Sequence, residues 1–177
     1  MRLNLARRYK RWRHGRGFGI HSPFAYDFIT RTLRERLPYY AYTKLDALAA
    51  AQRLGASEQR RLRLIFRIAV RFNPPSAAII GNRNDSLQKV ALKSVRRDIN
   101  LNADVPEADL IIVNDDSSRS LTLRDKAVCI FPDTNIGGQK TCEDIWAATT
   151  SGMRFDNSRG FTIIVKSPHL PHQHFDV

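Results

Sequence analysis

The sequence predicts an α/β protein with a mostly parallel sheet, one reversed edge strand and a helical N-terminal extension. Three observations carry this prediction. Apolar residues recur at helical spacing up to Phe72, strand-like and helix-like segments alternate after the break at 73–75, and two apolar segments close the chain around a turn with a glycine. The chain has 177 residues, of which 42% are hydrophobic, so it can bury a core without disulfides or metals.

Charge divides the chain at the same point. Residues 1–72 hold 17 Lys and Arg against 4 Asp and Glu, a net charge of +13, whereas residues 73–177 hold 12 against 13, a net charge of −1. We therefore expect two parts, a basic helical extension (1–72) and an α/β domain (73–177). The basic part either faces RNA or another polyanion, or it forms a solvated surface that keeps the protein soluble.

Several classes of protein fit poorly. Cys129 and Cys142 stand alone, without CxxC pairs, so neither a disulfide scaffold nor a zinc module is expected. Three histidines lie within 167–174, but two prolines keep that segment extended and we expect no metal site. Apolar runs are far shorter than the roughly 20 residues that span a bilayer, and no secretory signal is present. These features favour a cytoplasmic protein.

The first part is predicted to consist of helices. Residues 4–13 place Leu5, Tyr9 and Trp12 on one face of a basic helix, which could lie on RNA, on an anionic membrane or on the domain itself. After a glycine-rich stretch, Ser22 and Pro23 begin a helix that continues to about residue 36. His21, beside this stretch, either contacts a substrate or packs at the helix start.

Two further helices are expected before the break. One begins at Thr43, with Asp46 completing a capping box, and ends near Gly55. The other spans residues 57–72 and carries a ridge of arginines at positions i, i+3, i+7 and i+11: Arg60, Arg63, Arg67 and Arg71. Such a ridge could grip phosphates, or it could be a solvated helix face.

The second part alternates strands and helices. Strands are predicted at 76–81, 98–102, 109–113 and 126–131, and helices at 85–97 and 141–150, the latter with a capping box of Thr141 and Asp144. Segments 153–155 and 161–165 flank a turn and form a C-terminal antiparallel hairpin. Together these segments predict the sheet described above.

A strand that ends at Gly81, a strand that ends in Asp115 and Asp116, and a closing hairpin resemble a class I S-adenosylmethionine-dependent methyltransferase. The chain is most similar to a bacterial methyltransferase-like family with a Gly-Ile-His-Ser-Pro-Phe stretch, here 19–24, an Arg-rich helix before the first strand and a late tryptophan, here Trp146. The resemblance implies an abridged Rossmann-like methyltransferase sheet. Ligands of such sheets lie at the carboxyl ends of the strands.

The resemblance also implies site residues. The loop beneath the methionine part of S-adenosylmethionine would contain Ile80, Gly81 and Asn82. Asp115 and Asp116 would face the reacting centre, where they could take a proton, or they would only shape a turn. Asp98 is the nearest candidate for binding the ribose.

The chain also departs from the family pattern. The first loop keeps one glycine and lacks a preceding acid, and only 27 residues separate Gly81 from Asp109, so we expect one strand and one helix to be missing or vestigial. Two functions therefore stay open. One is a methyltransferase-like protein with an unknown acceptor, either active or catalytically inactive. The alternative is a non-catalytic protein that binds nucleic acid or an acidic partner through its basic helices.

Overall fold

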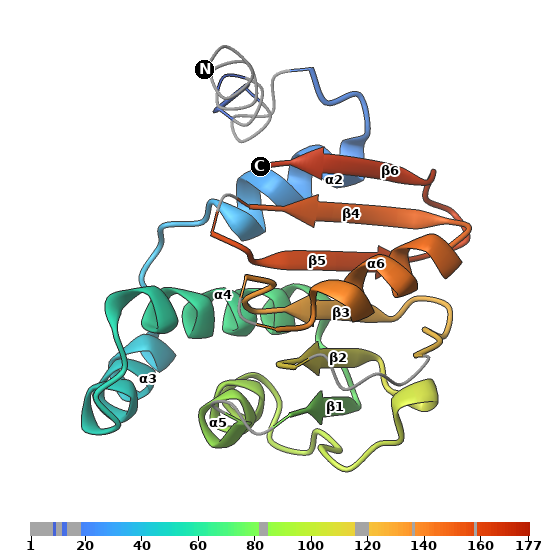
Figure 1. Ribbon diagram of the computed structural model, residues 1–177. Coiled ribbons are helices and arrows are strands. Elements are labelled where there is room, and N and C mark those ends of the chain that lie inside the picture. The colour runs from blue at the N-terminus through green and yellow to red at the C-terminus, as the bar shows by residue number, and fades with distance from the viewer. Residues whose placement is uncertain are drawn as a thin grey trace.

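The computed structural model describes residues 9, 12–13, 19–81, 85–115, 121–135, 137–157 and 159–177. The centre of this part of the chain is a six-stranded sheet with the order β1-β2-β3-β5-β4-β6 (Figure 1). The strands are β1 (Ala77–Ile80), β2 (Leu110–Val113), β3 (Val128–Phe131), β4 (Gly152–Asp156), β5 (Thr162–Lys166) and β6 (Gln173–Asp176).

Strand directions confirm one reversed strand in a sheet that otherwise runs one way. β1, β2 and β3 are parallel, β5 is antiparallel to both of its neighbours, and β6 is parallel to β4. The predicted position of the reversed strand at the edge is wrong, because β5 lies between β3 and β4. The edge strand at this side of the sheet is instead β6, a strand that was not predicted from the sequence.

Helices cover both faces of the sheet. The helical elements are α2 (Pro23–Phe28), the π-helical turn η1 (Ile29–Leu33), α3 (Tyr40–Ala51), α4 (Ala56–Phe72), α5 (Asp85–Val95), the 3-10 turn η2 (Val105–Glu107) and α6 (Gln139–Ala148). α2, η1, α4 and α5 pack on one face and α6 on the other, while α3 packs outside on α4 and α5 (Figure 1). A layer on each side explains why β2 and β3 are apolar and buried throughout.

The main hydrophobic core draws on both predicted parts of the chain. Phe28, Ile65 and Ile68 from the helices lie in one cluster with Leu110 and Ile163 from the sheet, and each is at most 1% exposed. The net charge of the sequence therefore changes between residues 72 and 73, whereas the hydrophobic core includes residues from both sides of this boundary.

The helix starts show which local signals decide. Ser22 caps α2 as expected, since its Oγ accepts a hydrogen bond from the Ala25 N–H at 3.3 Å. The other two predicted capping boxes are wrong. α3 begins at Tyr40, and the carboxylate of Asp46 binds Arg63 instead of a backbone amide. α6 begins at Gln139 after Gly138, which has a φ of +83°, so Thr141 lies inside the helix and is buried.

The predicted strand at 98–102 is also wrong. This segment makes only an isolated parallel bridge between Asn100 and Ser76. Among the described residues between β1 and β2, the connection contains α5 and η2 and no strand. None of the described helices is both long enough and apolar enough to cross a membrane.

Candidate functional site

The carboxyl ends of β1 and β2 lie side by side, because Ile80 pairs with Val113. Gly81 has a φ of +82°, and a Cβ at this position would lie 2.6 Å from Oδ2 of Asp115. Glycine is therefore required here, and the Asp115 carboxylate fills the space against it. Ile80 is half-buried and packs on the α6 side of the sheet. The other predicted residues of this edge, Asn82 and Asp116, lie outside the described residues.

Two further predicted site residues lie at the other end of the strands, near their amino ends. Asp98 is exposed and pairs with Arg96 at 3.1 Å, close to the bridge ahead of the amino end of β1. The hydrogen bond from Arg96 lowers the pKa of Asp98. His21 is exposed and precedes Ser22, whose Oγ lies 4.0 Å from Sδ of Met153 near the start of β4. Asp98 and His21 therefore do not lie in one site with Gly81 and Asp115.

A small cavity lies between α4, α5 and the ends of β2 and β3. Its volume is about 30 Å³, which is room for one or two water molecules. Gln88 and Asn114 exchange two side-chain hydrogen bonds of 2.8 and 3.0 Å in its wall. Nη2 of Arg61 binds the buried carboxylate of Asp133 at 2.7 Å, whereas Nε of Arg61 is buried without a partner among the described residues. Small-molecule sites usually start near 300 Å³, so this cavity suits water.

The arginine ridge of α4 is largely engaged in holding helices together. Arg63 forms a two-pronged pair with Asp46 of α3, and the hydrogen bond between them raises the pKa of Arg63. Arg67 donates to the carbonyl oxygens of Thr32 and Leu33 at 2.8 and 3.2 Å, which caps the end of η1.

Arg71 pairs with Asp27 of α2 at 2.6 Å. Three of the four ridge arginines thus connect α4 to another helical element. Arg60 is exposed, and its side chain has no partner among the described residues.

Arg60 borders a large groove between α4, the segment that follows η1 and the β4–β5 turn. We call it the arginine groove, and its volume is about 420 Å³. Its lining contains six arginines and a single acidic residue: Arg36, Arg60, Arg61, Arg63, Arg67, Arg159 and Glu35. The turn is fixed against α4, because Nη2 of Arg61 donates to the carbonyl oxygen of Arg159 at 3.2 Å.

Three guanidinium groups of the arginine groove are available for a ligand. The side chains of Arg36, Arg60 and Arg159 make no hydrogen bond or ion pair with any described residue. The Glu35 carboxylate accepts the backbone N–H groups of Arg36 and Leu37 at 2.7 and 2.8 Å, so its one negative charge offsets at most one of these three positive charges. The groove therefore carries a strong positive potential from three separate elements.

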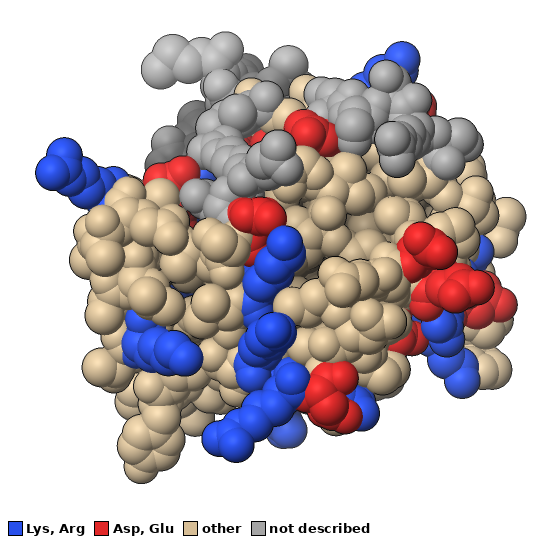
Figure 2. Space-filling view, turned by 90° about the horizontal axis from the view of Figure 1, so that it is seen from below, with Lys and Arg blue, Asp and Glu red and all other residues tan. Residues whose placement is uncertain are grey.

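The face that carries α5 differs from the arginine groove. Figure 2 shows basic side chains in a line over α5, with acidic side chains close to both ends of that line. Lys89 pairs with Asp85 at 3.0 Å, and Arg96 pairs with Asp98. Charges of both signs thus compensate one another on this face.

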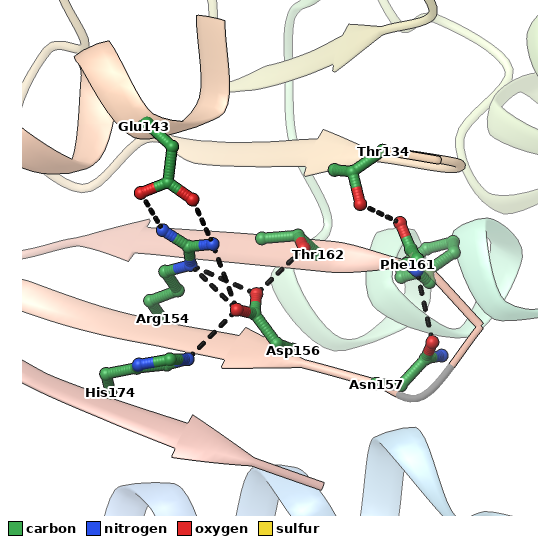
Figure 3. A network of polar contacts seen from close by, with 9 residues as sticks. Thr134, Glu143, Arg154, Asp156, Asn157, Phe161, Thr162 and His174 are labelled. Atoms are coloured by element: carbon green, nitrogen blue, oxygen red, sulfur yellow. Dashed lines mark hydrogen bonds and ion pairs between the residues drawn. The ribbon is translucent and has the colours of Figure 1, made fainter. Parts of the chain in front are cut away.

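A polar network lies on the face of the sheet that carries α6, outside the area covered by the apolar side of that helix (Figure 3). Arg154 of β4 donates to both oxygens of Glu143 at 2.8 and 2.9 Å and to Asp156 at 3.0 Å. Asp156 also accepts from Thr162 at 2.7 Å and contacts His174 Nε2 at 2.9 Å. The network joins α6, β4, β5 and β6.

The network fixes the charge of its members. Burial opposes the charge on Arg154, but hydrogen bonds to Glu143 and Asp156 outweigh it and raise the pKa of Arg154. Burial likewise opposes ionisation of Asp156, but hydrogen bonds from His174, Arg154 and Thr162 lower its pKa to about 2. This charge balance gives the network a structural role.

The remaining candidate nucleophiles and ligands are inert in this arrangement. Burial raises the pKa of the Cys142 thiol to about 12, and it raises the pKa of the Cys129 thiol well above its ordinary value. His172 stacks on Trp146 with ring centres 3.9 Å apart. No group of three or more metal-ligating side chains gathers among the described residues. Tyr9 and Trp12 stack at 6.0 Å, while most of the segment 4–13 lies outside the described residues.

Comparison with known proteins assigns no relative. No family model, no curated protein and no solved structure matches the chain.

Sequence reasoning found Arg60 but not the other two available arginines of the groove. Arg159 stands in a hairpin turn and Arg36 in a connection between helices, 123 positions apart in the chain. Helical periodicity can signal only residues of one helix. The pairing of the turn with α4 is a long-range contact, and no local pattern predicts it.

Proposed function

We propose that the arginine groove binds a phosphate-bearing polyanion. The observation that carries this proposal is the convergence of Arg36, Arg60 and Arg159, from three elements, on one groove with their guanidinium groups unpaired among the described residues. Guanidinium groups bind phosphate oxygens in pairs of hydrogen bonds. The net charge of +13 on residues 1–72 supports the proposal, because it attracts polyanions over a longer range.

Binding by this groove is expected to depend on three charges and not on net charge alone. The probe is inorganic polyphosphate, which displays phosphates without bases or lipid chains. In the variant with Arg36→Gln, Arg60→Gln and Arg159→Gln, affinity should fall at least tenfold. Each phosphate contact that is lost reduces the number of counterions released on binding. Calorimetric titration at low salt measures this.

A control variant removes the same charge elsewhere. Lys44→Gln, Lys93→Gln and Arg97→Gln change three exposed basic residues that lie outside the groove. This control should bind polyphosphate almost as tightly as the unchanged protein. Equal losses in both variants would mean that binding is non-specific, and absence of binding in the unchanged protein would refute the proposal.

One observation favours a second candidate function. Gly81 and Asp115 adjoin at the carboxyl ends of β1 and β2, in the chain order that underlies the resemblance to class I S-adenosylmethionine-dependent methyltransferases. We infer that S-adenosylmethionine is the cofactor to test at this edge, with the methyl acceptor unknown. In the arrangement described, the residues do not fit it, because Asp115 fills the space beside Gly81 and the adjoining cavity, with a volume of about 30 Å³, is too small for the cofactor.

The second candidate requires this edge to open. Calorimetric titration with S-adenosylmethionine and its demethylated product would then give saturable binding. Amide hydrogen exchange should slow at 80–81 and 114–115 in the same complex. Absence of binding at millimolar ligand would leave a methyltransferase-like sheet without its cofactor.

A further inference from the structure

A hollow lined by both polar and apolar side chains continues the arginine groove toward the sheet. Its volume is about 300 Å³, and it shares Leu33, Leu64, Asn157, Arg159 and Phe161 with the groove. Leu33, Leu64 and Val177 are half-buried in its wall. Arg34 and Arg159 stand among its lining residues, and neither side chain has a partner among the described residues. Positive charge thus lies beside a recess that has one apolar wall, formed by Leu33, Leu64 and Val177.

One polar side chain in this hollow is oriented by the backbone. Oδ1 of Asn157 accepts the N–H of Arg159 at 2.8 Å. It also accepts the N–H of Phe161 at 3.1 Å (Figure 3). The amide group is therefore fixed with its oxygen toward the turn. Its NH2 group makes no hydrogen bond with a described residue and can donate to a ligand.

We propose that this hollow takes an unpaired base of a single-stranded nucleic acid against its apolar wall, with the adjacent phosphates on Arg34 and Arg159. This inference rests on the proposed function of the arginine groove. Free phosphate or polyphosphate would use the arginines and leave the apolar wall without a partner. A base fills that wall, and its polar edge can accept from the NH2 group of Asn157.

Single strands suit the hollow better than duplexes. Bases in a duplex stay stacked and paired, whereas a single strand can turn a base out of the stack. A volume of about 300 Å³ lies at the lower end of small-molecule sites, which suits one base with its sugar. Tyr40 is fully exposed, three residues after Leu37 in the groove wall, and offers a surface on which a neighbouring base can stack.

The test compares three fluorescein-labelled probes by anisotropy at one salt concentration. The probes are a ten-nucleotide single-stranded DNA, an abasic strand with the same number of phosphates, and a duplex of the same sequence. The base-bearing single strand should bind at least tenfold more tightly than the other two. Equal affinity for the abasic strand or for the duplex would overturn the inference and leave the proposed function intact, whereas binding of no probe would overturn both.

Two variants locate the base without changing charge. Val177→Trp fills the hollow and should reduce affinity for the base-bearing strand to that for the abasic strand. Tyr40→Ala should weaken the base-bearing strand about tenfold, because stacking on an aromatic ring is lost. Tyr26→Ala, which removes another exposed tyrosine, is the control and should change nothing. If Tyr40→Ala and Val177→Trp both bind like the unchanged protein, the base does not lie here.

Discussion

At the scale of single residues, Arg154 shows how much one buried charge depends on its partners. Its side chain is 10% exposed and faces two carboxylates. Arg154→Met should lower the free energy of unfolding by about 3 kcal/mol, because Asp156 then stays buried without its cation. Arg124→Met removes a half-exposed arginine that pairs with Asp109, and should cost less than about 1 kcal/mol. Urea unfolding measures both, and equal losses would contradict the account of the network.

The carboxylate of Asp156 gives the same network a pH dependence. Its pKa falls from the ordinary 3.8 to about 2 in the folded chain, so ionised Asp156 stabilises the fold by about 2 kcal/mol. This stabilisation is complete above about pH 4 and is lost as the pH falls through 2. Asp156→Asn should therefore be less stable at pH 6, and the difference should shrink steadily between pH 4 and pH 2. A difference that stays constant over this range would contradict the prediction.

Residue-scale prediction from sequence succeeded where the pattern is local, as for the Ser22 cap of α2. Gly81 and Asp115 adjoin because each follows a strand and the two strands are parallel neighbours. Spacing on α4 correctly placed four arginines on one ridge, but could not show that three of them have partners. Asp27 and Asp46, which bind Arg71 and Arg63, lie far away in the chain and meet α4 only after folding.

At the scale of elements, the cap of α2 offers a clean test. Ser22 supplies a side-chain acceptor at the N-terminus of α2, directly before Pro23. Ser22→Ala should lower the free energy of unfolding by about 1 kcal/mol, since one backbone N–H loses its partner. Ser57→Ala in the first turn of α4 removes an exposed serine whose side chain makes no hydrogen bond with a described residue, and it serves as the control. Thermal unfolding of the two variants compares them, and an unchanged Ser22→Ala would contradict the cap.

Elements with strong apolar periodicity were predictable, and elements held by tertiary contacts were not. α4, β2 and β3 appear within two residues of their predicted bounds. β6 has three polar residues and one apolar residue, and it forms because Phe175 stacks on Phe155 with ring centres 5.4 Å apart and its backbone completes the edge of β4. η1 likewise depends on Arg67, which binds its last carbonyl oxygens from another helix.

At the scale of the whole molecule, the chain combines one continuous core with an uneven charge. Helices from the basic part complete the core of the sheet, so residues 20–72 of that part belong to the folded body. Its exposed arginines can therefore act together with a residue of the sheet, Arg159, which lies in the β4–β5 turn. The sequence predicted the charge excess but not this shared surface.

The salt dependence of binding is the sharpest test of whether the arginine groove binds phosphates. The measurement is the slope of log affinity against log salt concentration for a single-stranded oligonucleotide. The variant with Arg36→Gln, Arg60→Gln and Arg159→Gln should reduce that slope by about 2, because up to three phosphate contacts are lost at roughly 0.7 each. An unchanged slope, with affinity also unchanged, would show that the phosphates bind elsewhere and would contradict the claim.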